Sequence, residues 1–364
     1  MSEPRANTSS TEFSGAPREP GASPWMRQLG VVVAAAVVVA AAAGVARSNH
    51  SAEPAPRAWP HGPVTLVVTF PPGGGTDTLA RRLADRLHHK LGHAFVVENR
   101  AGASGNIGAQ SVARAKADGH TLLVANSSYA INPAVFTELG FDPARDLTGV
   151  VNVAYVPSVI VTAKDSSWAD LLSAIDAGRS SPPGALTVPE TAPSYASCGN
   201  GTPQHLAAGM LNQSTGSSWL HVPYRGCGPA LIDVLAGTVE LGVVTASSAL
   251  PHIQAGTLRA LAVTSAQRSA LLPETPTVAE LGVTGYELNQ WHGLLAPAET
   301  PETVLAQIRQ AAAQVLADAD MQQELIGLGY DLVPEEAAGE FQEVIQQDLG
   351  RFADAAKSIG LTMN

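Results

Sequence analysis

Three glycine- and proline-rich turns contain the residues of this sequence best suited to hold a negatively charged ligand. They are centred on Gly74, Gly201 and Gly228, and each opens a segment with helical periodicity. The main-chain N–H groups at a helix start lack acceptors and lie at the positive end of the helix dipole. Such a start attracts anions. The sequence therefore predicts an anion site built from main-chain groups on two sides of a cleft.

The first turn, residues 73–77, has two interpretations: a ligand cradle, or an ordinary tight connection between a strand and a helix. It is not a nucleotide-binding P-loop, because Thr78 and Leu79 stand where a glycine and a lysine are required. The second turn is not a dinucleotide fingerprint, because Gln204 occupies the position of the third glycine. Both turns remain candidates for binding a smaller anion.

The histidines form no recognisable catalytic or metal-binding pattern. The chain has ten, but none has the spacing of a zinc motif, and no GxSxG sequence occurs. His205 stands three residues after Thr202, an expected N-cap, and either donates to an anion or closes the first helical turn. We therefore expect no enzyme activity, no metal and no cofactor.

Cys198 and Cys227 are the only cysteines of the chain, and each stands in one of the later turns. Two cysteines in an exported protein favour a disulfide, which here would tie two ligand-facing loops together. The alternative is a pair of free, small, half-buried side chains. We expect the bridge.

Composition narrows the class of protein. The 364 residues are 45% hydrophobic and 15% charged, and the formal net charge is −11. A chain of this length is expected to form two lobes. Nucleic acids and anionic membrane surfaces require a basic patch that the sequence does not concentrate anywhere, so neither is expected as a partner. We expect a monomer.

Residues 1–62 are predicted to be a signal or anchor segment followed by a linker. Residues 29–46 form 18 apolar residues between Arg27 and Arg47, the pattern of an export signal with a cleavage site at its end. The length also permits an uncleaved membrane anchor. Met26 is an alternative start of translation. We expect a periplasmic protein.

The remainder alternates between strands and helices, which predicts βαβ units with a parallel sheet. Ligands of such sheets bind at the carboxyl ends of the strands, where residues 71–77 and 126–128 are expected to lie. Residues 147–163 read as one long strand that leaves the first lobe and enters the second. The predicted first lobe is residues 63–160 with 288–364, and the predicted second lobe is residues 161–287.

Seven stretches, in this order, closely resemble the Bug family, the extracytoplasmic substrate-binding receptors of tripartite tricarboxylate transporters. They are FPPGGGTDTLARRLADRL, VVENRAGASGNIGA, YASCGNGTPQHLA, HVPYRGCGPAL, ALPHIQAGTLRALAVTSAQR, PTVAELG and WHGLLAPAETP. The resemblance covers the chain from about residue 63 to its end. It implies an α/β, two-lobed type II periplasmic binding protein fold with a ligand cleft between the lobes, and a small organic carboxylate as ligand.

The resemblance also implies which residues line the cleft. In the family, a first-lobe loop, here residues 70–77, and a second-lobe loop, here residues 197–202, hold the carboxylate, often through ordered water, and a histidine follows the second loop. The implied ligand-binding residues are Phe70, Pro71, Pro72, Gly73, Gly74, Gly75, Thr76, Asp77, Asn126, Ser127, Ser128, Ser197, Cys198, Gly199, Asn200, Gly201, Thr202, His205 and Val244.

The sequence departs from the family pattern in three places. Val243 and Val244 stand where many relatives carry an aromatic residue and an aspartate, which favours a purely acidic or apolar-bodied carboxylate over an amino acid. Residues 186–193 are longer than the family's usual run, and the polar stretch before Met26 is unusual.

We therefore expect an exported receptor that closes on a carboxylate and presents it to a membrane permease of a tripartite transporter. Two rival functions remain open. One is a carboxylate sensor that residues 29–46 hold on the membrane and that signals to a kinase. The other is an α/β enzyme that acts on acyl or phosphate esters.

Overall fold

The computed structural model describes residues 58–179, 192–334, 337 and 339–361. The predicted signal and anchor segment lies outside these ranges, and so does most of the long run at residues 186–193. Within the described ranges, none of the helices combines the length and the apolar character needed to cross a membrane.

The first strands build a parallel sheet, because near-continuous apolar runs suit strands that are covered on both faces. Strand β1 (Val64–Val68) pairs in parallel with β2 (Phe95–Asn99) on one side and with β3 (Thr121–Asn126) on the other. Helices α2 (Gly75–Leu91) and α3 (Asn106–Ala113) connect these strands. This confirms the predicted βαβ units and brings the turns after β1 and β3 to the same sheet edge.

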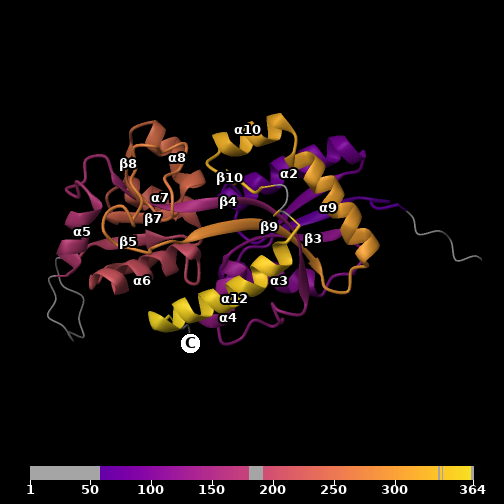
Figure 1. Cartoon of the computed structure of the whole chain (residues 1–364), viewed down its shortest axis with the longest axis horizontal. Helices are drawn as coiled ribbons and strands as arrows, with labels where there is room; N and C mark the ends of the chain where they lie inside the picture. The colour runs from indigo at the N-terminus through magenta and orange to yellow at the C-terminus, as the bar shows by residue number, and fades with distance from the viewer. Residues whose placement is uncertain (1–57, 180–191, 335–336, 338, 362–364) are drawn as a thin grey trace, which may run out of the picture. The chain divides into compact units, whose positions relative to one another are not determined.

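Two long antiparallel strands connect two groups of strands (Figure 1). Strand β4 (Leu147–Ala163) pairs with β9 (Asn289–Pro297) along its first part. Its last part pairs with β7 (Leu241–Thr245) and β8 (Leu258–Val263). The predicted long strand therefore exists, and its two ends belong to different parts of the sheet. The short strand β10 (Asp331–Leu332) also pairs with β4.

The second group repeats the parallel pattern. Strand β5 (Ser194–Ser197) lies between β6 (Leu220–Pro223) and β7 and is parallel to both. The main strand order is β2-β1-β3-β9-β4-β7-β5-β6. The helices of this part are α5 (Leu171–Gly178), α6 (Pro203–Thr215), α7 (Cys227–Leu235) and α8 (Ala246–Gln254). The fold is thus a two-lobed α/β fold, while the exact lobe boundaries stay a prediction.

The last part of the chain is helical and packs its apolar stripes inward, as the periodicity predicts. Leu305, Ile308, Ala312 and Val315 are buried on α9 (Glu302–Leu316), and Phe341, Ile345 and Phe352 are buried on α12 (Phe341–Ser358). Helix α10 (Ala319–Gly327) lies between them in the chain.

Three details of the helices differ from the sequence prediction. The sequence predicts Thr76 or Asp77 as the N-cap of the first helix, but helix α2 begins at Gly75 and has Gly74 as its N-cap. Helix α7 begins at Cys227 rather than at Gly228. Helix α4 (Ser128–Val135) was not predicted, because Pro133 lies inside it and proline disfavours a helix interior.

Candidate ligand-binding site

A cavity of about 270 Å³ lies between the turn after β1 and the turn before α7. We call residues 70–76 its first wall and residues 225–229 its second wall. The volume is slightly below the roughly 300–1,000 Å³ that is typical of small-molecule sites. The other lining residues are Asn126, Cys198, Gln204 and Thr245. The predicted turns around Gly74 and Gly228 therefore face the same cavity.

Three helices start at this cavity. Gly74, Gly226 and Thr245 are the N-caps of α2, α7 and α8, and all three line it. The first-turn N–H groups of a helix have no acceptor within the helix, and the helix dipole adds partial positive charge there. The cavity therefore combines three helix ends that favour a bound anion.

Asp77 stabilises the first wall from the side that faces away from the cavity. Its buried carboxylate accepts hydrogen bonds from the Gly73 N–H at 2.9 Å, from the Arg81 guanidinium at 2.9 and 3.0 Å, and from the Asn99 amide at 2.8 Å. Asn99 also donates to the Phe70 carbonyl at 3.0 Å. Burial acts to raise the pKa of Asp77, but these donors, Arg81 foremost, outweigh it and lower the pKa. Asp77 therefore stays charged.

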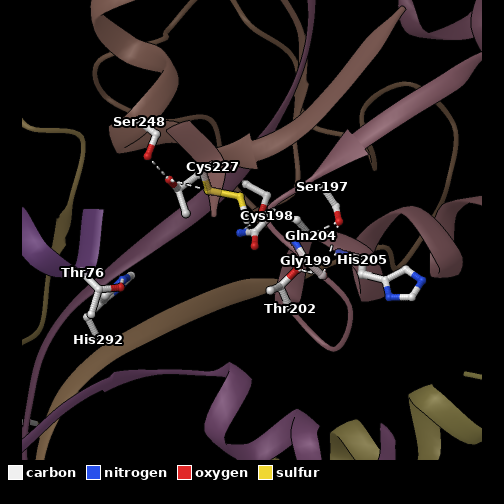
Figure 2. Close-up of a disulfide and its surroundings, with 12 residues drawn as sticks. Thr76, Ser197, Cys198, Gly199, Thr202, Gln204, His205, Cys227, Ser248 and His292 are labelled. Carbon is white, nitrogen blue, oxygen red and sulfur yellow. Dashed lines mark hydrogen bonds between the residues drawn. A yellow bond between two sulfur atoms is a disulfide. The ribbon is translucent and has the colours of Figure 1, made fainter. Parts of the chain in front are cut away.

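The last residues of the first wall contact β9 and the chain before β10. The Thr76 hydroxyl lies 3.2 Å from Nε2 of His292, which is fully buried. Burial lowers the pKa of His292 to about 3, so this imidazole is neutral. Tyr330 donates to the Gly75 carbonyl at 2.7 Å. Figure 2 shows Thr76 and His292 together, apart from the cysteines of the opposite wall.

The second wall is joined to the loop after β5. Cys198 and Cys227 have their Cα atoms 4.3 Å apart and their sulfur atoms at bonding distance (Figure 2). The Gly226 N–H donates to the Cys198 carbonyl at 3.1 Å. Gly226 has a φ of 115°, which a residue with a Cβ adopts only with strain. The loop at Cys198 therefore fixes where α7 begins.

Arg225 is the only charged residue among the described residues that line the cavity, and it is exposed. It also lines a second cavity of about 580 Å³, which shares Phe70, Pro71 and Cys198 with the first. No other charged residue lines the second cavity in the described part of the chain. We call the two cavities together the cleft, and Arg225 carries the only charge among its described lining residues.

Two stacked imidazoles lie behind the second-lobe loop. The rings of His205 and His221 have centroids 3.8 Å apart. Nε2 of His221 lies 2.6 Å from the Ser197 hydroxyl, and Nδ1 of His205 accepts the Gly201 N–H at 3.4 Å. Burial lowers the pKa of His205 to about 4, and burial together with His205 lowers the pKa of His221 to about 3. Both rings are neutral near pH 7.

His205 and Thr202 act locally on α6. Thr202 is the N-cap, as predicted, and its hydroxyl accepts the His205 N–H at 3.4 Å. The same hydroxyl donates to the Gly199 carbonyl at 2.7 Å. Figure 2 shows the His205 ring turned away from the two cysteines. In this structure His205 therefore closes the first helical turn.

The structure brings together some of the sequence-predicted binding residues. Residues 70–76, Asn126 and Cys198 line the first cavity, and Gly199 and Asn200 line the second. Those that line neither cavity are Asp77, Ser127, Ser128, Ser197, Gly201, Thr202, His205 and Val244.

Two buried members of this second group have partners in the protein. The Ser127 hydroxyl accepts the Trp291 N–H at 3.0 Å, and Val244 pairs with Val159 in the sheet. Direct contact of any of the predicted residues with a ligand stays a prediction.

Sequence reasoning missed several lining residues. Arg225, Gln204 and Thr245 line the first cavity, and residues 101–105 line the second. Arg225 had a readable signal, because it is a cation directly before a predicted glycine turn. The other positions are uncharged residues in the loop after β2 and at the starts of α6 and α8, and the sequence alone does not show that these three places meet at one cleft.

Comparison with known proteins agrees with this geometry. Protein BugT of Bordetella pertussis is 34% identical over 274 residues, which are 75% of this chain and 82% of BugT. The structure of Rpa4515 from R. palustris with adipate has 33% sequence identity and a TM-score of 0.76, and the match covers 84% of this chain and 100% of that one. MatC from Rhodopseudomonas palustris with bound malate has 29% identity and a TM-score of 0.74, and the match covers 82% and 99%.

The fold and the cleft thus define a two-lobed solute-binding protein of the periplasmic type. Residues 79–361 match the model of the tripartite tricarboxylate transporter family receptor, TctC. The chain belongs to this family, and the resemblance to the Bug receptors is confirmed. Family and fold are those of a binding receptor.

Proposed function

We propose that this chain is an exported, non-catalytic receptor that binds a small organic carboxylate between its two walls and delivers it to a tripartite tricarboxylate-type secondary transporter. The observation that carries this proposal is the cleft itself: three helix starts and Arg225 line it, and none of the described residues that line it is acidic. The acids in the two related structures, adipate and malate, support a carboxylate.

Helix starts provide N–H donors that are fixed before the ligand arrives, so little free energy is lost in ordering them. Arg225 adds a charge that can form two parallel hydrogen bonds to one carboxylate. A protein with a net charge of −11 can bind an anion in this way, because local dipoles and one guanidinium decide the potential inside a narrow cleft.

Binding is coupled to closure of the cleft. The Ser104 hydroxyl donates to the Asn200 carbonyl beside the second cavity. Near the first cavity, a Cβ on Gly75 would lie 2.7 Å from the Ser247 hydroxyl, so the two sides already touch there. A ligand that contacts both walls favours this closed form over an open one. The permease then recognises the closed form.

The remaining parts of the proposal concern the location of the protein. Residues 29–46 direct export to the periplasm, where an oxidising environment allows Cys198 and Cys227 to form their bridge. Export with cleavage gives a free receptor, and retention of the segment gives an anchored one. Sequencing the N-terminus of the exported protein distinguishes these forms.

A thermal-shift screen against a panel of carboxylates tests the binding function. A ligand at a hundred times its dissociation constant adds about 2.7 kcal/mol to the free energy of unfolding. We expect at least one small carboxylate to raise the melting temperature, with adipate and malate as the first members of the panel. If no carboxylate raises it, the proposal is wrong.

Arg225→Gln tests the cation in the cleft. A charge-assisted hydrogen bond contributes about 1.5–3 kcal/mol, and 1.4 kcal/mol corresponds to tenfold in affinity. We expect binding to weaken about tenfold and Arg225→Lys to recover part of the loss. Arg145→Gln is the control, because Arg145 is exposed and does not line the cleft. Equal affinities for the Arg225 and Arg145 variants would remove Arg225 from the site.

A further inference from the structure

A small polar chamber lies under the cleft, between the end of β1 and helices α3 and α4. Four of its lining residues have a buried polar side-chain atom without a hydrogen-bond partner in the protein. These atoms are Thr69 Oγ1, Asn106 Nδ2, Ser128 Oγ and Asn132 Oδ1. None of the four residues is more than 5% exposed. A buried polar atom without a partner costs free energy, so four around one cavity indicate an occupant.

The size of the chamber restricts the occupant. It leaves about 10 Å³ for the centre of a water-sized molecule, which is about the minimum for one water, roughly 10–15 Å³. A buried water typically makes about three hydrogen bonds to polar groups that would otherwise be unpaired. The four unpartnered atoms are enough for these three hydrogen bonds.

The two asparagines determine whether the occupant is a water or a cation. Asn132 Nδ2 donates to the Ser104 carbonyl at 3.0 Å, and a carbonyl only accepts, so Asn132 Oδ1 is the acceptor left without a partner. Asn132 Nδ2 also donates to Asn106 Oδ1 at 2.7 Å, which leaves Asn106 Nδ2 as the free group. An amide N–H donor repels a cation but suits the oxygen of a water. No charged side chain lines the chamber in the described part of the chain.

We infer that the chamber binds a single resident water molecule. It accepts from Asn106 Nδ2, donates to Asn132 Oδ1, and exchanges its other hydrogen bonds with the hydroxyls of Thr69 and Ser128, which can donate or accept. The water thereby ties the end of β1 to α3 and α4.

This water supports the contact that closes the second cavity. Asn132 holds the carbonyl of Ser104, whose hydroxyl donates to Asn200 across the cleft. Ala103 and Ser104 have φ values of 45° and 53°. Residues other than glycine seldom adopt such angles unless the surroundings impose them. The water and Asn132 are part of those surroundings, so loss of the water is expected to loosen the Ser104 loop.

A crystal structure of the protein at atomic resolution is the direct test. We expect one peak in the chamber, within hydrogen-bonding distance of at least three of the four atoms, whether or not a carboxylate occupies the cleft. An empty chamber, side chains paired with one another, or a peak with the short distances of a metal ion would each overturn the inference. The peak in the chamber and the melting-temperature screen are separate measurements, so failure of this inference can be distinguished from failure of the proposed function.

Thr69→Val and Ser128→Ala each remove one partner of the water with little change in shape. We expect the peak to weaken or disappear and carboxylate binding to weaken roughly 2- to 10-fold, the effect of one hydrogen bond. Thr300→Val is the matched control, because Thr300 is also buried with an unpartnered hydroxyl but lies outside the chamber. If both chamber variants still show the peak and bind carboxylate as tightly as the Thr300→Val control, the water does not support the Ser104 loop.

Discussion

The two walls of the cleft present similar groups to the ligand but are held in place in different ways. The first wall is a glycine turn shaped by hydrogen bonds to the buried carboxylate of Asp77. The second wall is a glycine turn joined at Cys227 to the loop of Cys198. One wall therefore depends on a charge and the other on a covalent bond. The comparison shows that similar main-chain N–H donors can be held in place by a buried carboxylate or by a disulfide. Loss of the charge should affect the first wall, and reduction of the disulfide should affect the second.

Loss of the bridge between Cys198 and Cys227 is the largest expected effect. The cysteines are 29 residues apart, and in the chain-entropy model closing a loop of this size stabilises the fold by about 3–4 kcal/mol. We expect the double variant Cys198→Ala/Cys227→Ala to lose that amount in denaturant unfolding and to bind carboxylate more weakly, because the second wall is no longer tied to its neighbour.

Treatment of the wild-type chain with a reductant should reproduce both losses, whereas the double variant should not respond to reductant. Equal stability of the oxidised wild type and the double variant would show that the second wall does not depend on the bridge.

Asp77→Asn tests the support of the first wall. The amide keeps the shape of the side chain but loses the charge and presents a donor to the Gly73 N–H or to Arg81. Each charge-assisted hydrogen bond contributes about 1.5–3 kcal/mol, and the amide retains some of these bonds. We therefore expect the free energy of unfolding to fall by roughly 2–3 kcal/mol. Chemical denaturation measures it.

Asp85→Asn is the control for this change, because Asp85 lies on the exposed side of the same helix. We expect a change within about 0.5 kcal/mol there. If the two variants were equally stable, Asp77 would not be the support of the first wall.

The comparison extends to acid sensitivity, through Asp77 behind the first wall and His221 beside the loop after β5. Protonation of the unfolded chain at His221 begins below about pH 6.5, but the folded pKa is about 3. The unfolded state therefore binds more protons between these values, and stability falls as the pH is lowered through this window. Asp77 is an acid and not a base, but its stabilising effect is also lost as the pH falls. Its pKa is lower in the folded than in the unfolded state, so this loss begins only near its ordinary pKa of 3.8.

His221→Gln should thus reduce the loss of stability between pH 7 and pH 5 by roughly 1–2 kcal/mol. His205 and His292 remain and keep part of the pH dependence, because burial lowers their pKa values as well. Urea unfolding at the two pH values measures the difference. An unchanged loss would mean that His221 is not held neutral by the fold.

Much of the fold was readable from the sequence, because apolar runs and capping residues report on their own segments. The strand at residues 147–163 and the cap at Thr202 were predicted with the observed bounds. Residues 128–135 were missed as a helix, because Pro133 obscures the local signal and packing against α12 overrides it.

The site was less readable, because the sequence shows residue types but not the direction of a side chain. Asp77 follows a glycine turn and reads as a ligand contact, yet it faces Arg81 and Asn99 behind the wall. Conversely, Thr69 gives no signal in the sequence, and only its burial next to three other unpaired polar groups gives it a role.

The central claim is that one carboxylate is held by main-chain donors from both walls together with Arg225. A crystal structure of the protein with the carboxylate that most strongly raises its melting temperature tests this directly. We predict carboxylate oxygens within hydrogen-bonding distance of N–H groups in residues 73–76 and 226–228 and of the Arg225 guanidinium. An acid bound outside the cleft, or held by one wall alone, would contradict the account.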